Sequence, residues 1–170
     1  MPDNREVVDI VKQRTLDDLL ADATTRIVRF SPAEAYAATR VDALLIDIRS
    51  ESDRKLDGIV PGSLHLPRTV LEWRTAPDSS FRNPHVGALD RQIILLCDHG
   101  YSSVLAALVL TELGFTRAGD IIGGFAAWRS ADLPVSRARR RTRGPDGRAG
   151  MGAPDPENDT SQRASSGSQR

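Results

Sequence analysis

The sequence contains a single cysteine, Cys97, among its 170 residues. No disulfide can form within the chain, which excludes a small secreted fold held by disulfides and favours a reducing compartment. Long hydrophobic runs are also missing, since the richest run, residues 104–110, is far shorter than the roughly 20 apolar residues of a membrane span. The first ten residues include several charged ones and have no apolar stretch of signal-peptide length. We therefore expect a soluble, cytoplasmic protein without a membrane partner.

Neither sign of charge is in excess, because 23 basic residues balance 23 acidic ones. Binding to nucleic acid or lipid through bulk charge is therefore not expected. The balance conceals a basic end, since residues 135–170 contain eight arginines and four acidic residues but few large apolar ones. This composition predicts a disordered Arg/Gly/Ser-rich tail over 136–170. A solvated tail is the simplest interpretation, although its RARRRTR run could touch RNA or an acidic partner.

The length allows one domain with tails, at roughly 100–200 residues per domain. Leu16, Leu19 and Leu20 have helical spacing but no strong boundary follows them. We therefore expect an N-terminal extension over 1–26 and one domain over 27–135. The hydrophobic content of 39% is sufficient for a single core.

Apolar runs rich in branched residues alternate with helix signals across this domain. Ser31, Pro32 and Glu34 have the pattern of a capped helix start. Strands are predicted over 43–48, 63–67, 92–97 and 118–122, with QIILLC at 92–97 in a central position. Further helical segments are predicted over 69–74, 102–113 and 123–130; Ser102 or Ser103 is expected to cap the second, and Gly114 to end it. The alternation predicts an α/β fold with a parallel sheet.

The segment CDHGYSS, residues 97–103, connects a predicted buried strand to a predicted helix. Ligands bind at the carboxyl ends of strands in open α/β sheets. Loop N–H groups and the positive end of the helix would favour the Cys97 thiolate and lower its pKa below about 8.5. Gly100 allows a tight loop, and Ser102 and Ser103 can donate hydrogen bonds to an anion. Cys97 is therefore a candidate nucleophile, with a small buried hydrophobe as the alternative.

Four segments together resemble a single rhodanese domain, the sulfurtransferase family, over about residues 30–135. They occur in the family's order: LLIDIRSESD (44–53), GIVPGSLHLP (58–67), ILLCDHGYSS (94–103) and IIGGFAAW followed by LPV (121–135). The paired serines after Tyr101, together with VLEWR at 70–74, are most similar to an actinobacterial-type branch. The resemblance implies a parallel sheet with helices on both faces.

The resemblance also implies persulfide chemistry. Cys97 would take the outer sulfur of a small-molecule donor such as thiosulfate and pass it to cyanide, a cellular thiol or a protein acceptor. No cofactor or metal would be required, and the scattered histidines His65, His85 and His99 show no metal-ligand spacing. Persulfide or substrate would be held by the rest of the loop, namely Asp98, His99, Gly100, Tyr101, Ser102 and Ser103.

Supporting residues are expected at the ends of neighbouring segments. Asp47 and Arg49 are expected to form an ion pair that supports the loop, with direct substrate contact as the alternative. Trp73 and Trp128 are expected to pack against the core. Tyr101 could cover the pocket or only shield the loop.

The loop departs from the family in its charge. Many active members have arginine five residues after the cysteine, where this chain has Ser102, and Asp98 adds a negative charge. A dianionic donor would lose on the order of 1 kcal/mol of binding. Our hypothesis is that Arg68 or Arg74 restores the missing cation; the alternative is that both are solvated surface residues. A tyrosine phosphatase is not expected, because its phosphate-binding arginine would stand at Ser103.

Two other functions remain open. The chain could be a rhodanese-like binding or regulatory module with little turnover, or a thiol sensor oxidised at Cys97. The sulfurtransferase, the binding module and the thiol sensor all share a lowered pKa of Cys97, so the pKa does not distinguish them. Loading of sulfur on Cys97 and its release do.

Overall fold

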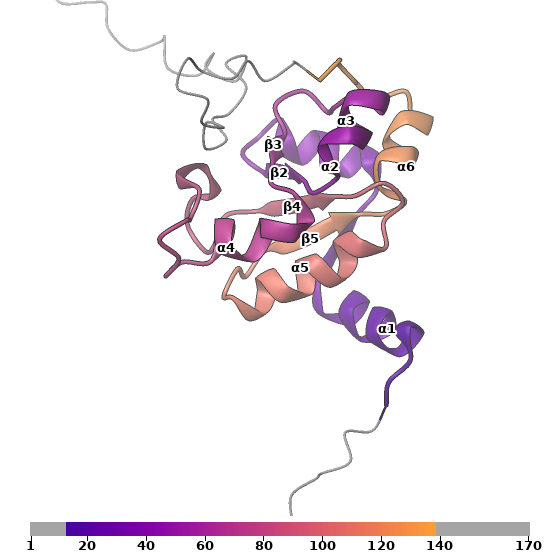
Figure 1. Cartoon of the computed structure of the whole chain (residues 1–170). Coiled ribbons are helices and arrows are strands. Elements are labelled where there is room, and N and C mark those ends of the chain that lie inside the picture. The colour runs from indigo at the N-terminus through magenta and orange to yellow at the C-terminus, as the bar shows by residue number, and fades with distance from the viewer. Residues whose placement is uncertain (1–12, 139–170) are drawn as a thin grey trace, which may run out of the picture.

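The computed structural model describes residues 13–138. A single parallel sheet has the strand order β1-β5-β4-β2-β3 (Figure 1). The strands are β1 Val28–Phe30, β2 Leu44–Asp47, β3 Leu64–His65, β4 Ile93–Leu96 and β5 Ala118–Ile121. The predicted α/β class and the central position of β4 are confirmed.

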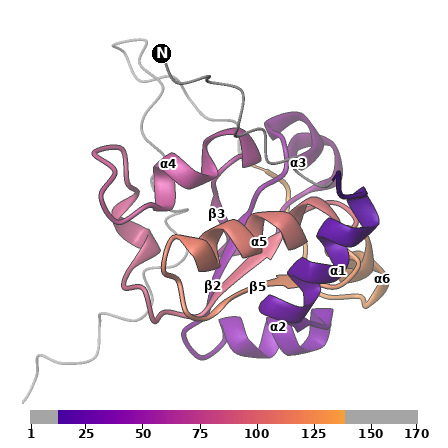
Figure 2. The ribbon, with the colours of Figure 1, turned by 90° about the horizontal axis from the view of Figure 1, so that it is seen from below.

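Helices cover both faces of the sheet, as expected. In Figure 1 the sheet lies between α2 and α6 on one side and α4 and α5 on the other. Figure 2 shows α5 and α1 lying together over the same face. The α-helices are α1 Leu16–Arg26, α2 Pro32–Thr39, α3 Glu51–Asp57, α4 Leu71–Thr75, α5 Ser102–Glu112 and α6 Gly124–Ser130, and two 3₁₀ turns span Arg68–Val70 and Pro84–Val86.

The two faces have separate hydrophobic cores, and β4 contributes to both. Ile93 and Leu95 pack into the core beneath α4 and α5, whereas Ile94 and Leu96 pack beneath α2 and α6. Successive side chains of a strand point to opposite faces, so a central strand must be apolar at every position. This requirement explains why the uninterrupted run in the sequence predicts β4 correctly.

The helix boundaries confirm one expected cap and correct another. Ser31 and Glu34 form the reciprocal capping box at the start of α2. By contrast, neither serine of the loop caps α5, whose N-cap is Tyr101 without a side-chain hydrogen bond. The hydroxyl of Ser103 is engaged elsewhere, with Cys97 and a buried carboxylate.

Both ends of the domain include contacts that the pattern did not predict. Residues 16–26, expected in an extension, form α1, which packs on α5 with Ala23 fully buried. Strand β1 follows at once and pairs with β5. At the other end, Ser136 pairs with Ile59 in an isolated antiparallel bridge. The predicted disordered tail lies outside the described residues from 139 onward.

The two tryptophans differ in how deeply they are buried. Trp128 is fully buried, donates from Nε1 to the carbonyl of Pro134 at 3.0 Å, and packs edge-on against Tyr36. Trp73 is 59% exposed, so its predicted burial is wrong. The reason is helical geometry: α4 buries Leu71 and Thr75, which lie on one face at a spacing of four, and Trp73 between them points to the opposite side.

Candidate active site

Cys97 follows β4 and is only 5% exposed. The backbone N–H of Gly100 donates to its Sγ atom at 3.1 Å. The thiol in turn donates to Oγ of Ser103, also at 3.1 Å. The chain therefore curls around the sulfur, as the loop sequence predicts.

Two opposing effects act on the Cys97 thiol. Burial by itself raises the pKa of Cys97, whereas hydrogen bonds with the hydroxyls of Ser103 and Ser102 and with the backbone of Ser103 and Gly100 lower it. The hydrogen bonds dominate, so the pKa of Cys97 lies below its ordinary value. A buried sulfur that favours the thiolate is suited to nucleophilic attack.

The start of α6 holds the loop from its other side. Phe125 N–H donates to the Cys97 carbonyl at 2.8 Å, and Ala126 N–H donates to the Asp98 carbonyl at 3.0 Å. Gly124 has φ +59°, and a Cβ there would lie 2.4 Å from the Cys97 carbonyl oxygen. The second glycine of the GG pair is thus required for the close approach of α6 to the cysteine.

A buried carboxylate lies behind the loop. Ser103 Oγ donates to Oδ2 of Asp120 at 3.0 Å, and Asp120 on β5 has no exposed surface. Arg29 on β1 donates to Asp120 twice, from Nε to Oδ1 at 2.8 Å and from Nη2 to Oδ2 at 3.1 Å. The same Nη2 donates to the Gly100 carbonyl at 3.3 Å. Arg29 therefore reaches the loop from the edge strand of the sheet.

Sequence reasoning missed both Asp120 and Arg29. One available signal was the acid itself, because Asp120 is the only charged residue within a run of residues expected to form a strand, AGDII. A charge in such a strand is stable only with a buried partner. Arg29 gave no signal, since β1 was not predicted and its pairing with Asp120 spans 91 positions.

Asp47 and Arg49 form the expected ion pair. Arg49 donates to Asp47 from Nε at 3.0 Å and from Nη2 at 2.8 Å, with both side chains fully buried. Arg54 adds a contact to Asp47 at 3.1 Å, and the Arg49 guanidinium stacks 3.6 Å from the Phe125 ring centre. Nη1 of Arg49 lies 4.0 Å from Oδ1 of Asp98. The geometry supports a structural pair that also faces the loop.

Arg68 and Arg74 have partners within their own segment. Arg68 pairs with Glu72 one turn later, and Arg74 donates to the Phe81 carbonyl at 2.7 Å. The hypothesis that either supplies the missing cation stays a prediction. By contrast, Arg29 contacts Gly100 of the loop and Arg49 lies beside Asp98.

Three further loop residues are exposed. They are His99, Tyr101, which is 68% exposed, and Ser102, whose hydroxyl nevertheless hydrogen-bonds Cys97. Burial raises the pKa of Asp98, an effect that the nearby Arg49 opposes. Within residues 13–138, no three His, Cys, Asp or Glu side chains are grouped so as to hold a metal ion, and no helix is long and apolar enough to cross a membrane.

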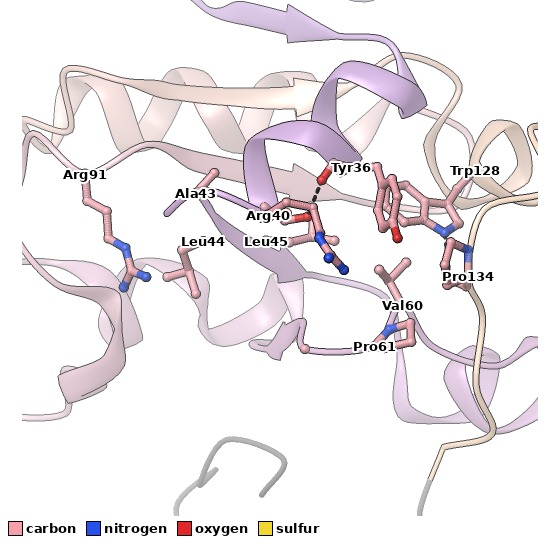
Figure 3. Close-up of a pocket in the computed structure, with 12 residues that line it drawn as sticks. Tyr36, Arg40, Ala43, Leu44, Leu45, Val60, Pro61, Arg91, Trp128 and Pro134 are labelled. Atoms are coloured by element: carbon pink, nitrogen blue, oxygen red, sulfur yellow. Dashed lines mark hydrogen bonds between the residues drawn. The ribbon is translucent and has the colours of Figure 1, made fainter. Parts of the chain in front are cut away.

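A separate cavity of about 390 Å³ lies between α2 and the start of β2 (Figure 3). Tyr36, Arg40 and Trp128 line it, together with Pro61 from the turn before β3. No residue of the 97–103 loop is part of its lining. The nucleophile does not open into this cavity.

More than half of the chain is similar in sequence to known proteins. The sequence model of the family described as "Rhodanese-like domain" matches residues 31–131. A thiosulfate sulfurtransferase GlpE from Stutzerimonas stutzeri is 33% identical over 106 residues, 62% of this chain and 87% of the relative. The protein of the same name from Haemophilus influenzae is 31% identical over 109 residues, 64% of this chain and 93% of the relative.

Solved structures agree on the fold. A protein of unknown function from Rhodopseudomonas palustris, described as a possible tyrosine phosphatase, has a TM-score of 0.68 and 30% identity, covering 73% of this chain and 96% of its own. The polysulfide-sulfur transferase homodimer of Wolinella succinogenes has a TM-score of 0.56 and 25% identity, covering 72% of this chain and 87% of its own.

Proposed function

This chain belongs to the family of rhodanese-like domains, and on that basis we propose that Cys97 carries a sulfane sulfur from a donor to a thiophilic acceptor. The chain is a sulfurtransferase, in keeping with its relatives named thiosulfate sulfurtransferase. The observation that carries the proposal is the cradle around Cys97, in which the Gly100 N–H and the Ser103 hydroxyl both contact Sγ.

The reaction divides into two displacements at sulfur. In the first, the Cys97 thiolate attacks the outer sulfur of a donor such as thiosulfate. A new S–S bond forms, the donor's own S–S bond breaks, and sulfite leaves with the bonding electron pair. In the second, an acceptor such as cyanide or a thiolate attacks the outer sulfur of the Cys97 persulfide, and the Cys97 thiolate leaves. Neither step requires an external oxidant or reductant.

The loop stabilises the sulfur anion throughout both steps. The N–H of Gly100 and the hydroxyl of Ser103 are already placed at hydrogen-bond distance from Sγ, so stabilising the anion requires only that the Ser103 hydroxyl turn toward it. The neighbouring Asp98 and the missing arginine at position 102 disfavour a dianionic donor. We therefore propose that the natural donor is less strongly anionic than thiosulfate.

Sulfur loading tests the proposed function directly. Purified, reduced protein is treated with thiosulfate, or with a glutathione persulfide, and its intact mass is measured before and after cyanide. We expect a gain of one sulfur atom that cyanide removes, and no gain in Cys97→Ser. If no donor loads the wild-type protein, the sulfurtransferase proposal is wrong.

Replacing Ser102 tests the charge argument. In Ser102→Arg, the added cation should raise kcat/KM for thiosulfate about fivefold, corresponding to about 1 kcal/mol of restored contact. Ser102→Gln is the matched control, since it also removes the hydroxyl that contacts Cys97 but adds no charge. An arginine variant no faster than the glutamine variant would remove the charge argument.

Other functions would require different residues or a different chemistry of the 97–103 loop. A phosphatase, the description given to one structural neighbour, needs a planar cation for phosphate, and Ser103 stands where that arginine would be. A binding module or a thiol sensor would keep the cradle without transferring sulfur. Hydrolysis of an aryl phosphate by the purified protein would favour the phosphatase instead.

The setting of the reaction follows from the chemistry. We propose that the partners are a small-molecule donor and a thiol or protein acceptor. We place the reaction in the cytoplasm, because the chain's one cysteine must stay reduced to act. The paired serines after Tyr101 support assignment to the actinobacterial-type branch.

A further inference from the structure

A line of four hydrogen-bonded side chains extends from the nucleophile to the edge of the sheet. It begins at Cys97, passes through Ser103 and Asp120, and ends at Arg29. The first three residues are buried, and the Arg29 side chain is 27% exposed. The sulfur transfer proposed above needs only the first contact, so the other two call for an explanation.

We propose that Asp120, anchored by Arg29, is a positioning residue that directs the single hydroxyl proton of Ser103 and thereby sets how readily Cys97 gives up its own proton. This inference rests on the proposed function only for its purpose, because the proton equilibrium exists without any sulfur donor.

The donors and acceptors along Cys97, Ser103 and Asp120 follow from the number of protons that each group can donate. A serine hydroxyl donates one hydrogen bond and accepts up to two. While Cys97 is a thiol, its S–H donates to Ser103, and Ser103 donates to Asp120. Once Cys97 has lost its proton to solvent, the sulfur anion and the Asp120 carboxylate compete for the same hydroxyl proton.

Arg29 decides that competition in favour of the sulfur. Because Arg29 donates to both oxygens of Asp120, the carboxylate keeps two hydrogen bonds when Ser103 turns away. The hydroxyl can then donate to the sulfur anion without leaving a buried carboxylate unsatisfied. Arg29 also donates to the carbonyl of Gly100, and the N–H of Gly100 is another donor to Sγ. One guanidinium therefore supports two of the hydrogen bonds to the sulfur, those of Ser103 and Gly100.

The charges around Cys97 come from several elements. Asp98 and His99 lie on the loop itself, and Arg49 approaches Asp98 from the end of β2. The first turn of α5 contains no acidic residue. Arg29 and Asp120 are the charged residues linked to the sulfur through hydrogen bonds, and their signs are opposite.

Opposite charges predict opposite shifts in the pKa of Cys97. Asp120→Asn removes a negative charge and leaves Arg29, so the thiolate is favoured and the pKa should fall by about one unit. Arg29→Gln leaves the Asp120 carboxylate uncompensated, so the pKa should rise by about one unit. In the double variant Asp120→Asn/Arg29→Gln, the pKa of Cys97 should return close to its wild-type value. Arg29→Lys keeps the positive charge, so it should shift the pKa of Cys97 less than Arg29→Gln does.

The full-length protein is titrated by its ultraviolet thiolate absorbance and by the pH dependence of alkylation with iodoacetamide. Cys97 is the only cysteine, so both signals come from one group. Arg129→Gln and Asp57→Asn are matched controls, because this Arg–Asp pair lies on the surface between α6 and α3. Neither control should move the pKa.

If Asp120→Asn and Arg29→Gln shift the pKa of Cys97 in the same direction, the proposal is overturned, because general damage to the loop would act alike in both variants. The absence of a shift in either variant would overturn it too. If Arg29→Gln does not fold, the Asp120→Asn and Arg29→Lys titrations still decide the matter. In a Ser103→Ala background, the Asp120→Asn shift should shrink; an undiminished shift would contradict a route through the hydroxyl. Opposite shifts in a protein that never loads sulfur would sustain this inference while refuting the proposed function.

Discussion

Cys97→Ser is expected to lower the rate of sulfur transfer at least about 1,000-fold, with the fold intact. A serine hydroxyl ionises far less readily than a thiol and cannot form the persulfide that carries the sulfane sulfur. Oγ fits the space of Sγ, and its hydroxyl can still contact Ser103 and the Gly100 N–H. The rate of thiocyanate formation from thiosulfate and cyanide measures the loss, and the denaturation midpoint checks the fold.

The wild-type enzyme supplies the companion measurement. Because the loop lowers the pKa of Cys97, the thiolate forms at a lower pH than in a free cysteine. The transfer rate should therefore rise with pH and reach half of its plateau value at a pH below the ordinary pKa of a cysteine thiol. A serine variant with more than a tenth of the wild-type rate would exclude Cys97 as the sulfur carrier.

Asp47→Ala is expected to destabilise the fold by about 3–5 kcal/mol, the usual result of removing one member of a buried ion pair. The variant leaves the guanidinium of Arg49 buried without its carboxylate, and Nη1 of Arg49 already has no hydrogen-bond acceptor within residues 13–138. Equilibrium unfolding in urea measures the change. Sulfur loading should also weaken, because Arg49 stacks on Phe125, whose N–H holds the carbonyl of Cys97.

Two comparisons separate charge burial from general damage. The double variant Asp47→Leu/Arg49→Met removes both charges and should be more stable than Asp47→Ala alone. Lys55→Gln breaks an exposed pair with Glu51 on α3 and should cost less than about 0.5 kcal/mol. If Asp47→Ala proves no more destabilising than Lys55→Gln, the buried pair does not support the site.

Strong local patterns correspond closely to the observed elements. Strands β2, β4 and β5 were predicted to within two residues at each end, because buried parallel strands need apolar side chains on both faces. The capping box of α2 was also predicted, since its hydrogen bonds join Ser31 to Glu34 within one turn. Such features depend on neighbours in the sequence, so pattern alone is enough to find them.

Other features depend on contacts between distant residues and were missed or misjudged. Strand β1 has only three residues and exists through its pairing with β5. The exposure of Trp73 depends on which face of the short helix α4 meets the core. Ser102 or Ser103 was expected to cap α5, but the N-cap is Tyr101, and the Ser103 hydroxyl bonds Cys97 and Asp120 instead.

The amino-acid sequence is enough to establish the alternation of strands and helices, the position of Cys97 after a buried strand, and the family to which those motifs belong. All of these depend on residue type and local spacing. By contrast, the folding of distant segments against one another sets which charged side chains are linked to the sulfur of Cys97. Arg29 and Asp120 meet because β1 and β5 pair in register, and Ser103 meets Asp120 because α5 packs over β5. Hydrogen bonds between side chains 17 and 91 positions apart have no local signature, because the folded sheet brings them together.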